Sequence, residues 1–177
     1  LKPGLERQAV WAAELSTVPY DGFSISDERL FNFTVNENAE FEVVGPRGAR
    51  RAILRSSGEF ARESNHGVHY HFPIELTRIY EGGQMNLDLT ARSSMQTPTE
   101  SMFVRCVAPG VTDSGWMRVP VETQWETKRV VCDVPPGAAR AGFGTIIWSD
   151  AEGDSGWVEL REIRVLVRPP DLRPAAS

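Results

Sequence analysis

The segment Gln84-Met-Asn-Leu-Asp-Leu-Thr-Ala-Arg92 is the clearest guide to the fold class of this chain. Apolar residues stand at every second position in it, and polar residues stand between them. Because the side chains of a β-strand point alternately to its two faces, this alternation predicts a strand with one face in a core and the other in water. Such half-buried strands are typical of antiparallel sheets.

Similar runs recur along the chain, separated by clusters of Gly, Pro, Asp and Ser. We expect strands at residues 31–35, 41–44, 49–57, 67–75, 84–92, 101–108, 116–122, 125–134, 140–149 and 157–167. Many short strands with turn residues between them indicate an all-β antiparallel sandwich or barrel. In the last run the apolar spacing shifts by one residue at Arg161–Glu162, which predicts a β-bulge there.

The two ends of the chain differ from this middle part. Residues 5–15 are rich in helix formers and predict a short N-terminal helix. Residues 169–177 are rich in proline and read as a linker or frayed tail. We therefore expect a lead-in helix and strand at residues 1–40, a β-sandwich at 41–168 and a Pro-rich tail at 169–177, in a module cut from a larger protein.

Composition excludes several classes of protein. The 177 residues are 41% hydrophobic and 24% charged, as in an ordinary globular domain. The net charge of −5 argues against a nucleic-acid binder that works by whole-surface attraction. No apolar run is long enough to span a membrane. Hydrolase motifs such as Gly-x-Ser-x-Gly are absent, and no His follows His71, so we expect a binding protein rather than an enzyme.

Several segments resemble jelly-roll carbohydrate-binding modules of the galactose-binding-domain-like superfamily. The similar elements occur in the same order in this chain: an apolar stretch, a Gly turn and a strand ending in Ala-Arg at residues 74–92; Thr123-Gln-Trp125 before an alternating strand; Pro135-Pro-Gly137; Gly142-Phe-Gly144; and an ending at residues 155–160. The resemblance covers residues 41–167. It implies an antiparallel jelly-roll β-sandwich, which follows the short N-terminal helix expected at residues 5–15, and a non-catalytic, extracytoplasmic carbohydrate-binding function.

The resemblance also assigns the strands to two sheets. One sheet would contain the strands at 49–57, 84–92, 125–134 and 157–167, and the other those at 67–75, 101–108, 116–122 and 140–149. The outer face of the second sheet is then the expected sugar-binding face. The family often has an acidic residue in the bulge of the final strand, tied to a structural calcium ion. Arg161 stands there in this chain, which argues against calcium, and no cofactor is expected.

Alternation along the second sheet selects the candidate ligand-binding residues. His69 and His71 point outward if Val68 and Tyr70 fill the core. The phase of the strand at 140–149 stays open, because both of its faces carry apolar residues. The candidate binding surface consists of His69, His71, Phe103, Arg105, Trp116, Arg118 and Trp148.

These residue types suit a glycan. Aromatic rings stack on the apolar C–H face of a pyranose, and polar side chains hold its hydroxyl groups. Arginine pairs with a carboxylate or a sulfate through two parallel hydrogen bonds. The expected ligand is therefore an acidic or polyhydroxylated glycan or polysaccharide.

Two alternatives come from other classes of protein. His69-Tyr-His71-Phe-Pro-Ile-Glu75 has the His-x-His-x3-Glu spacing of the first cupin motif, so His69, His71 and Glu75 are candidate ligands of a metal-dependent enzyme. The leading Gly of that motif and a later His are missing. The second alternative is a protein-interaction module that uses the exposed aromatic residues as anchors.

The sequence does not determine whether the two cysteines form a disulfide. Cys106 and Cys132 take the inward phase on strands of opposite sheets, 26 positions apart. They form either one disulfide between the sheets or two small buried apolar side chains.

Overall fold

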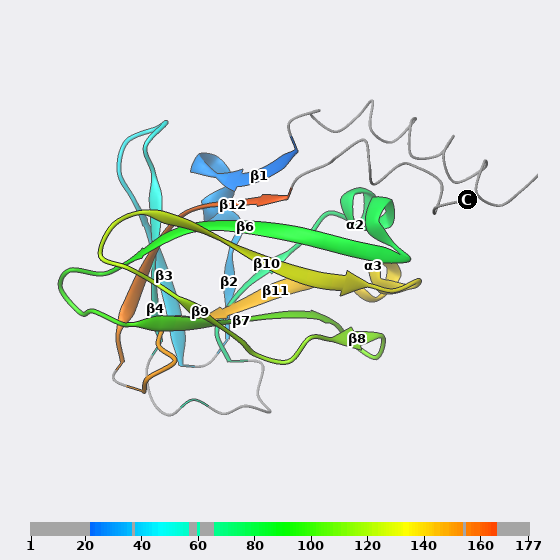
Figure 1. Ribbon diagram of the computed structural model, residues 1–177. Coiled ribbons are helices and arrows are strands. Elements are labelled where there is room, and N and C mark those ends of the chain that lie inside the picture. The colour runs from blue at the N-terminus through cyan, green and yellow to red at the C-terminus, as the bar shows by residue number, and fades with distance from the viewer. Residues whose placement is uncertain (1–21, 37, 57–59, 61–65, 154, 166–177) are drawn as a thin grey trace, which may run out of the picture.

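The computed structural model describes residues 22–36, 38–56, 60, 66–153 and 155–165. Two antiparallel sheets lie face to face in this part of the chain, as Figure 1 shows. The predicted all-β antiparallel sandwich is therefore confirmed. The predicted helix at 5–15 and the tail at 169–177 lie outside the described residues.

The first sheet, sheet A, has the strand order β10-β6-β12-β4-β3, with β1 paired to β12. Its members are β1 (Phe23–Ser26), β3 (Ala39–Val44), β4 (Arg51–Ser56), β6 (Gly83–Ser93), β10 (Glu126–Val134) and β12 (Trp157–Val165). It contains the four strands assigned to one sheet from the sequence. Strand β1, from the predicted lead-in segment, pairs with residues 162–165 of β12, an interior strand.

The second sheet, sheet B, has the order β2-β5-β11-β7-β8, with β9 also paired to β7. Its members are β2 (Thr34–Val35), β5 (Val68–His71), β7 (Ser101–Ala108), β8 (Thr112–Asp113), β9 (Met117–Pro120) and β11 (Gly144–Trp148). The other four strands assigned from the sequence are all in this sheet. A 3₁₀ helix, η1 (Asp27–Asn32), and helices α2 (Ile74–Tyr80) and α3 (Ala138–Ala141) complete the described elements.

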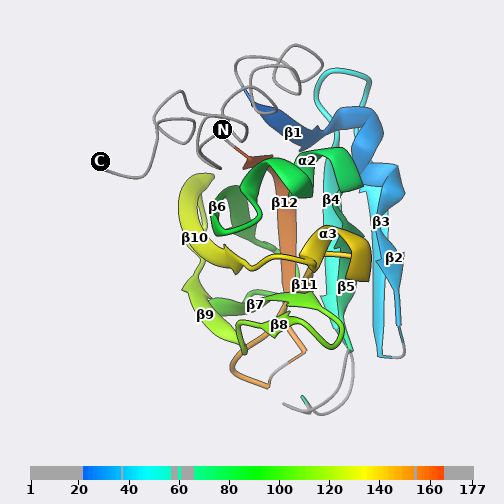
Figure 2. The same cartoon turned by 90° about the vertical axis from the view of Figure 1, so that its right-hand side faces the viewer.

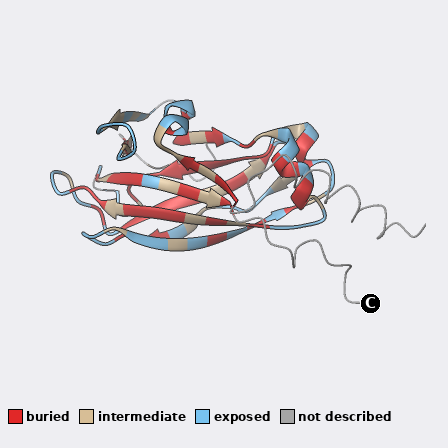
Figure 3. Ribbon diagram, turned by 90° about the horizontal axis from the view of Figure 1, so that it is seen from above, coloured by how far each residue is buried: buried red, intermediate tan, exposed pale blue. Residues whose placement is uncertain are grey.

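The core lies between the two sheets. Leu87 and Leu89 of β6 and Val104 of β7 are fully buried in it. Figure 3 shows buried residues concentrated in the strands and exposed residues in the connections. Burying each such side chain contributes about 1.5–3 kcal/mol, so the alternation seen in the sequence is also the main source of stability.

The predicted bulge is present in β12. Its register against β6 shifts between Leu160 and Glu162. Arg161 is the extra residue, and its side chain is exposed. The extra residue of a bulge is left out of regular strand pairing, so the Arg161 side chain is added to the outer surface of sheet A.

The strand predicted at 67–75 is wrong beyond His71. Pro73 follows β5, and α2 begins at Ile74. Proline lacks the N–H that pairing to a neighbouring strand requires. The segment after it buries Leu76 and Ile79 on one helical side, whereas Ile74, which would share the core face of Val68 and Tyr70 if the strand continued, is 47% exposed.

The strand predicted at 140–149 starts later than expected. Arg140 lies in α3, and β11 begins at Gly144. Gly142 ends α3 with a φ of 92°, a left-handed conformation that glycine adopts without steric cost.

Helices α2 and α3 pack against each other at one end of the sandwich (Figures 1 and 2). They close the end of the core between the sheets, where Leu76 and Ala138 are buried. Among the described residues, no helix has the length and apolar character needed to cross a membrane.

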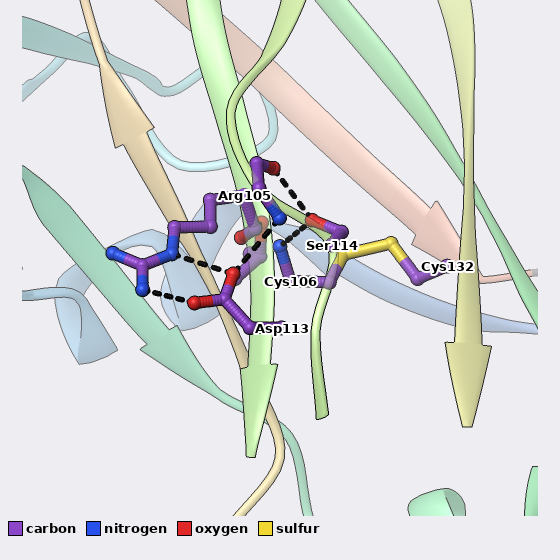
Figure 4. The surroundings of a disulfide bond; sticks show 7 residues. Arg105, Cys106, Asp113, Ser114 and Cys132 are labelled. Carbon is purple, nitrogen blue, oxygen red and sulfur yellow. Dashed lines mark hydrogen bonds and ion pairs between the residues drawn. A yellow bond between two sulfur atoms is a disulfide. The ribbon is translucent and has the colours of Figure 1, made fainter. Parts of the chain in front are cut away.

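The cysteines form a disulfide that joins the two sheets. Cys106 lies on β7 of sheet B and Cys132 on β10 of sheet A, and their Cα atoms are 6.1 Å apart. Both are at most 1% exposed. The bond lies on the core side of β7 (Figure 4).

We expect this disulfide to stabilise the fold by about 3 kcal/mol, because it closes a loop of 26 residues in the unfolded chain. Reduction, or the double change Cys106→Ala and Cys132→Ala, should lower the free energy of unfolding by that amount in urea titrations. Reductant should have no effect on the double variant. Equal stability of the oxidised and reduced forms would contradict the prediction.

Candidate functional site

The register of β11 against β5 and β7 shows which residues share the outer face of sheet B. Ile146 lies directly opposite His69 on β5 and Arg105 on β7, and Trp148 lies opposite Phe103. Residues that stand opposite each other in an antiparallel pair point to the same face. His69, Arg105, Phe103 and Trp148 therefore share one face with Ile146.

This register settles the phase that the sequence left open. Thr145 stands opposite Cys106, whose disulfide fixes it on the core side. Ile146 and Trp148 therefore point to the outer face of sheet B. All five residues of β11 are buried. The sequence of this strand therefore has no alternation of apolar and polar residues that would reveal its outward face.

The aromatic residues of this face are covered. Trp148 is 2% exposed and Phe103 is 6% exposed. The ring of Phe60 stacks on Phe103 with centroids 4.7 Å apart, and lies 5.2 Å from Trp116 and 5.6 Å from Trp148. The expectation that Phe103 and Trp148 offer open stacking surfaces is therefore wrong.

We call Phe60, Phe103, Trp116 and Trp148 the aromatic cluster. Sequence reasoning missed Phe60, because it stands in a polar stretch with no strand alternation. An isolated large apolar residue in such a stretch was the available signal. The indole Nε1 of Trp148 donates a hydrogen bond to the Asp150 carbonyl oxygen at 3.0 Å, which fixes the ring in the cluster. The aromatic anchors of the protein-interaction alternative are therefore mostly buried.

Arg105 already has an anionic partner. Its Nε donates to Asp113 Oδ1 at 2.8 Å, and its Nη2 pairs with Asp113 Oδ2, as Figure 4 shows. The hydrogen bond from Arg105 lowers the pKa of Asp113, and the backbone N–H of Gly115 adds to this effect. The guanidinium also lies over the ring of Trp116, 5.5 Å from its centroid.

Arg118 is paired as well, although it is half exposed. Its Nη1 lies 2.5 Å from Glu152 Oε1 and donates to the Ser101 hydroxyl at 3.1 Å. Its guanidinium carbon lies 5.3 Å from the Phe103 centroid, at the edge of the aromatic cluster. Both arginines expected to hold an acidic sugar therefore have carboxylate partners within the protein.

A groove of about 210 Å³ opens on the same face, at the end of the sandwich that holds α3. Its lining comes from β5, β7, β11 and the end of α3, and consists of His69, Tyr70, His71, Val107, Pro109, Ala141, Gly142, Gly144, Thr145 and Ile146. We call it the His groove. Its outward-facing side chains are two imidazoles and small or branched apolar groups.

Two features define the groove. Gly144 has no room for a side chain, since a Cβ there would lie 2.6 Å from the Tyr70 carbonyl oxygen. The His69 ring lies 3.1 Å from the Asn36 amide nitrogen, through Nε2, and its centroid is 6.3 Å from that of His71. The His71 side chain is exposed. The floor is thus flat and apolar, and imidazoles line it on the β5 side.

The metal-site alternative does not fit this geometry. Glu75 lies on α2, beyond the end of β5, so it does not continue the face of His69 and His71. A cupin site would place those histidines inside the barrel, whereas Tyr70 and Phe72 fill the core here. Within the described part of the chain, no group of three or more His, Cys, Asp or Glu side chains is arranged to hold a metal ion.

The sequence matches no family model and no curated protein. Solved structures do match. The CBM22-1 xylan-binding domain of Paenibacillus barcinonensis Xyn10C is 9% identical with a TM-score of 0.55, over 85% of this chain and 99% of that one. The C-terminal family 22 carbohydrate-binding module of Clostridium thermocellum Xyn10B is 13% identical with a TM-score of 0.54, over 85% and 97%.

A further xylan-binding domain of family 22 is 14% identical, with a TM-score of 0.53 over 84% of this chain and 97% of that one. At such identities the shared property is the fold. The chain thus has the jelly-roll β-sandwich fold of these carbohydrate-binding modules, as the sequence resemblance implied. Each match spans nearly the whole of the solved module.

We predict that Phe60→Ala will uncover the aromatic cluster, because the Phe60 ring packs against two tryptophans. Tryptophan emission should shift to longer wavelength and acrylamide quenching should increase. Phe31→Ala, at a 52% exposed position on η1, is the matched control and should leave both unchanged. Identical quenching in wild type and Phe60→Ala would show that Phe60 does not cover the face.

The Arg105–Asp113 pair predicts a dependence of stability on pH. The pKa of Asp113 in the folded protein lies below its ordinary value of 3.8, so the pair stabilises the fold fully above that value and loses this effect as pH falls through the lower pKa. The difference in Tm between wild type and Asp113→Asn should be constant above about pH 5 and shrink below 3.8. A difference that persists unchanged in acid would contradict this.

Proposed function

We propose that this chain is a non-catalytic carbohydrate-binding module that holds a sugar chain in the His groove. The observation that carries the proposal is the groove itself. It lies on the outer face of one sheet, with an apolar floor and two imidazoles, in the same fold as solved xylan-binding modules.

The groove offers the two contacts that a pyranose needs. Val107, which is half-buried, presents an apolar group to the C–H face of a sugar ring, and the exposed imidazole of His71 hydrogen-bonds its hydroxyl groups. The volume of about 210 Å³ is smaller than the ~300 Å³ lower bound of drug-sized pockets. A single ring fills it, and the rest of a chain lies along the open face.

The proposed ligand of this groove is a neutral, hydroxyl-rich chain of the xylan type. Arg105 and Arg118 have carboxylate partners, so neither guanidinium is available to pair with an acidic sugar without breaking an existing ion pair. Of the described residues that line the groove, only the histidines can carry positive charge, and only when protonated.

The setting we propose is outside the cytoplasm, in a larger protein that the module anchors to polysaccharide. The Cys106–Cys132 disulfide supports this setting, because structural disulfides persist in oxidising compartments. Nucleic acid is not a proposed partner, given the net charge of −5.

The test fills the groove without touching the core. Val107→Trp places an indole in the groove and should abolish retardation in affinity gels that contain soluble xylan. Val131→Trp, at a 43% exposed position on β10 of the other sheet, makes the same change elsewhere and should bind as wild type.

A wider panel tests the class of ligand. Wild-type protein should bind at least one of soluble xylan, β-glucan and mannan, and His71→Ala should bind it more weakly. Equal binding by Val107→Trp and wild type would place the sugar elsewhere. Absence of binding to every neutral polysaccharide in the panel would overturn the proposed function.

A further inference from the structure

The outer face of sheet A carries a second cluster of aromatic and basic side chains. Trp125 directly precedes β10, and two guanidinium groups lie over its ring. The Arg92 guanidinium carbon is 4.5 Å from the ring centroid and that of Arg161 is 4.7 Å. Indole stacking of this kind stabilises a guanidinium and leaves its N–H groups at the edge open to hydrogen bonding.

Arg161 owes this position to the bulge in β12. As the extra residue between Leu160 and Glu162, it is turned away from regular pairing and is exposed. Within the described part of the chain, its side chain contacts Trp125 and has no ion pair. Its N–H donors therefore face solvent from a fixed position.

The charges around Trp125 do not balance. Glu159, 8% exposed, lies 2.6 Å from Arg51 Nε and accepts a hydrogen bond from Arg92 Nη2 at 3.0 Å. Glu162, which follows Arg161 and pairs with Thr90, adds a second carboxylate that accepts a hydrogen bond from the Ser24 hydroxyl. Together with Arg161, three guanidinium groups therefore stand beside two carboxylates, and one positive charge is in excess.

Other arginines on the same face do have their own acids. Arg55 pairs with Glu42 at 3.0 Å, and Arg129 forms a bidentate pair with Asp88. The positive charge of the Trp125 cluster thus lies beside compensated ion pairs, on a protein whose net charge is −5. Such a cluster attracts an anion at short range and not through the field of the whole molecule.

Hydroxyl groups lie beside the cluster. Thr90 Oγ1 and Thr127 Oγ1 are 2.8 Å apart, and Thr90 is paired with Glu162, which follows Arg161 in the bulge. Thr127 is two residues from Trp125 on the same strand face. Guanidinium, indole and hydroxyl groups together match a sugar ring that carries an oxyanion.

We infer that Arg161, held against the Trp125 ring, forms a second binding site, for the oxyanion of an acidic saccharide, while Arg92, paired with Glu159, packs on the same indole. Guanidinium groups pair in the same way with the carboxylate of a uronic acid and with a sulfate ester, so both sources share this chemistry. The site lies on the sheet opposite the His groove. It does not depend on the proposed function, and either can fail without the other.

The experiment measures dissociation constants by isothermal titration with two soluble probes, polygalacturonate for the carboxylate and heparin fragments for the sulfate. Arg161→Gln removes the unpaired guanidinium and should weaken binding of at least one probe about tenfold, the cost of a lost charge-assisted pair. Arg47→Gln makes the same change of charge at the exposed β3–β4 turn and should bind as wild type.

Two further variants and probes separate a specific site from general charge attraction. Arg161→Lys keeps the charge but loses the planar fork, so it should bind more weakly than wild type. Xylan binding by Arg161→Gln should equal that of wild type, and thermal unfolding verifies its fold. Equal weakening by Arg47→Gln, unchanged binding by Arg161→Gln, absence of binding to both probes, or equally tight binding of a DNA duplex would each overturn the inference.

Discussion

The link between Cys106 and Cys132 sets the orientation of the whole binding face. It ties β7 of sheet B to β10 of sheet A and fixes Cys106 toward the core. Because neighbouring side chains on a strand point to opposite faces, Arg105 and Val107 must then point outward. Pairing of β7 with β11 carries the same parity to Ile146. The disulfide thus fixes the same parity as the buried Val104 and Ala108, and this parity determines which groups line the outer surface.

That surface is divided into two parts by the Arg105–Asp113 pair. On one side the aromatic cluster is filled by Phe60, and on the other the His groove stays open above Gly144. The ion pair satisfies a charge that would otherwise select an anionic ligand. Aromatic and basic residues on a sheet face are therefore weak indicators of ligand chemistry until their partners are known, since stacking and pairing within the protein use the same groups.

The two outer faces differ in charge compensation. On sheet B the arginines of the candidate surface are matched by acids, whereas on sheet A the cluster around Trp125 contains more guanidinium groups than carboxylates. The bulge in β12 causes this difference, because it adds Arg161 without adding an acid opposite it. A one-residue irregularity in strand pairing is thereby converted into a local positive charge.

Period-two alternation was enough to predict the class of fold, the bulge at Arg161 and the parity of β5 and β7, because it records which side chains leave water. The assignment of the strands to two sheets came from the resemblance to jelly-roll modules. It misplaced residues 72–75, since Pro73 ends the strand and the helical spacing that follows is short. The phase of β11, the burial of Trp148 beneath Phe60 and the pairing of Arg105 with Asp113 became known only from the folded chain. These features depend on contacts between residues distant in the chain, or on a strand buried on both faces, where alternation carries no information.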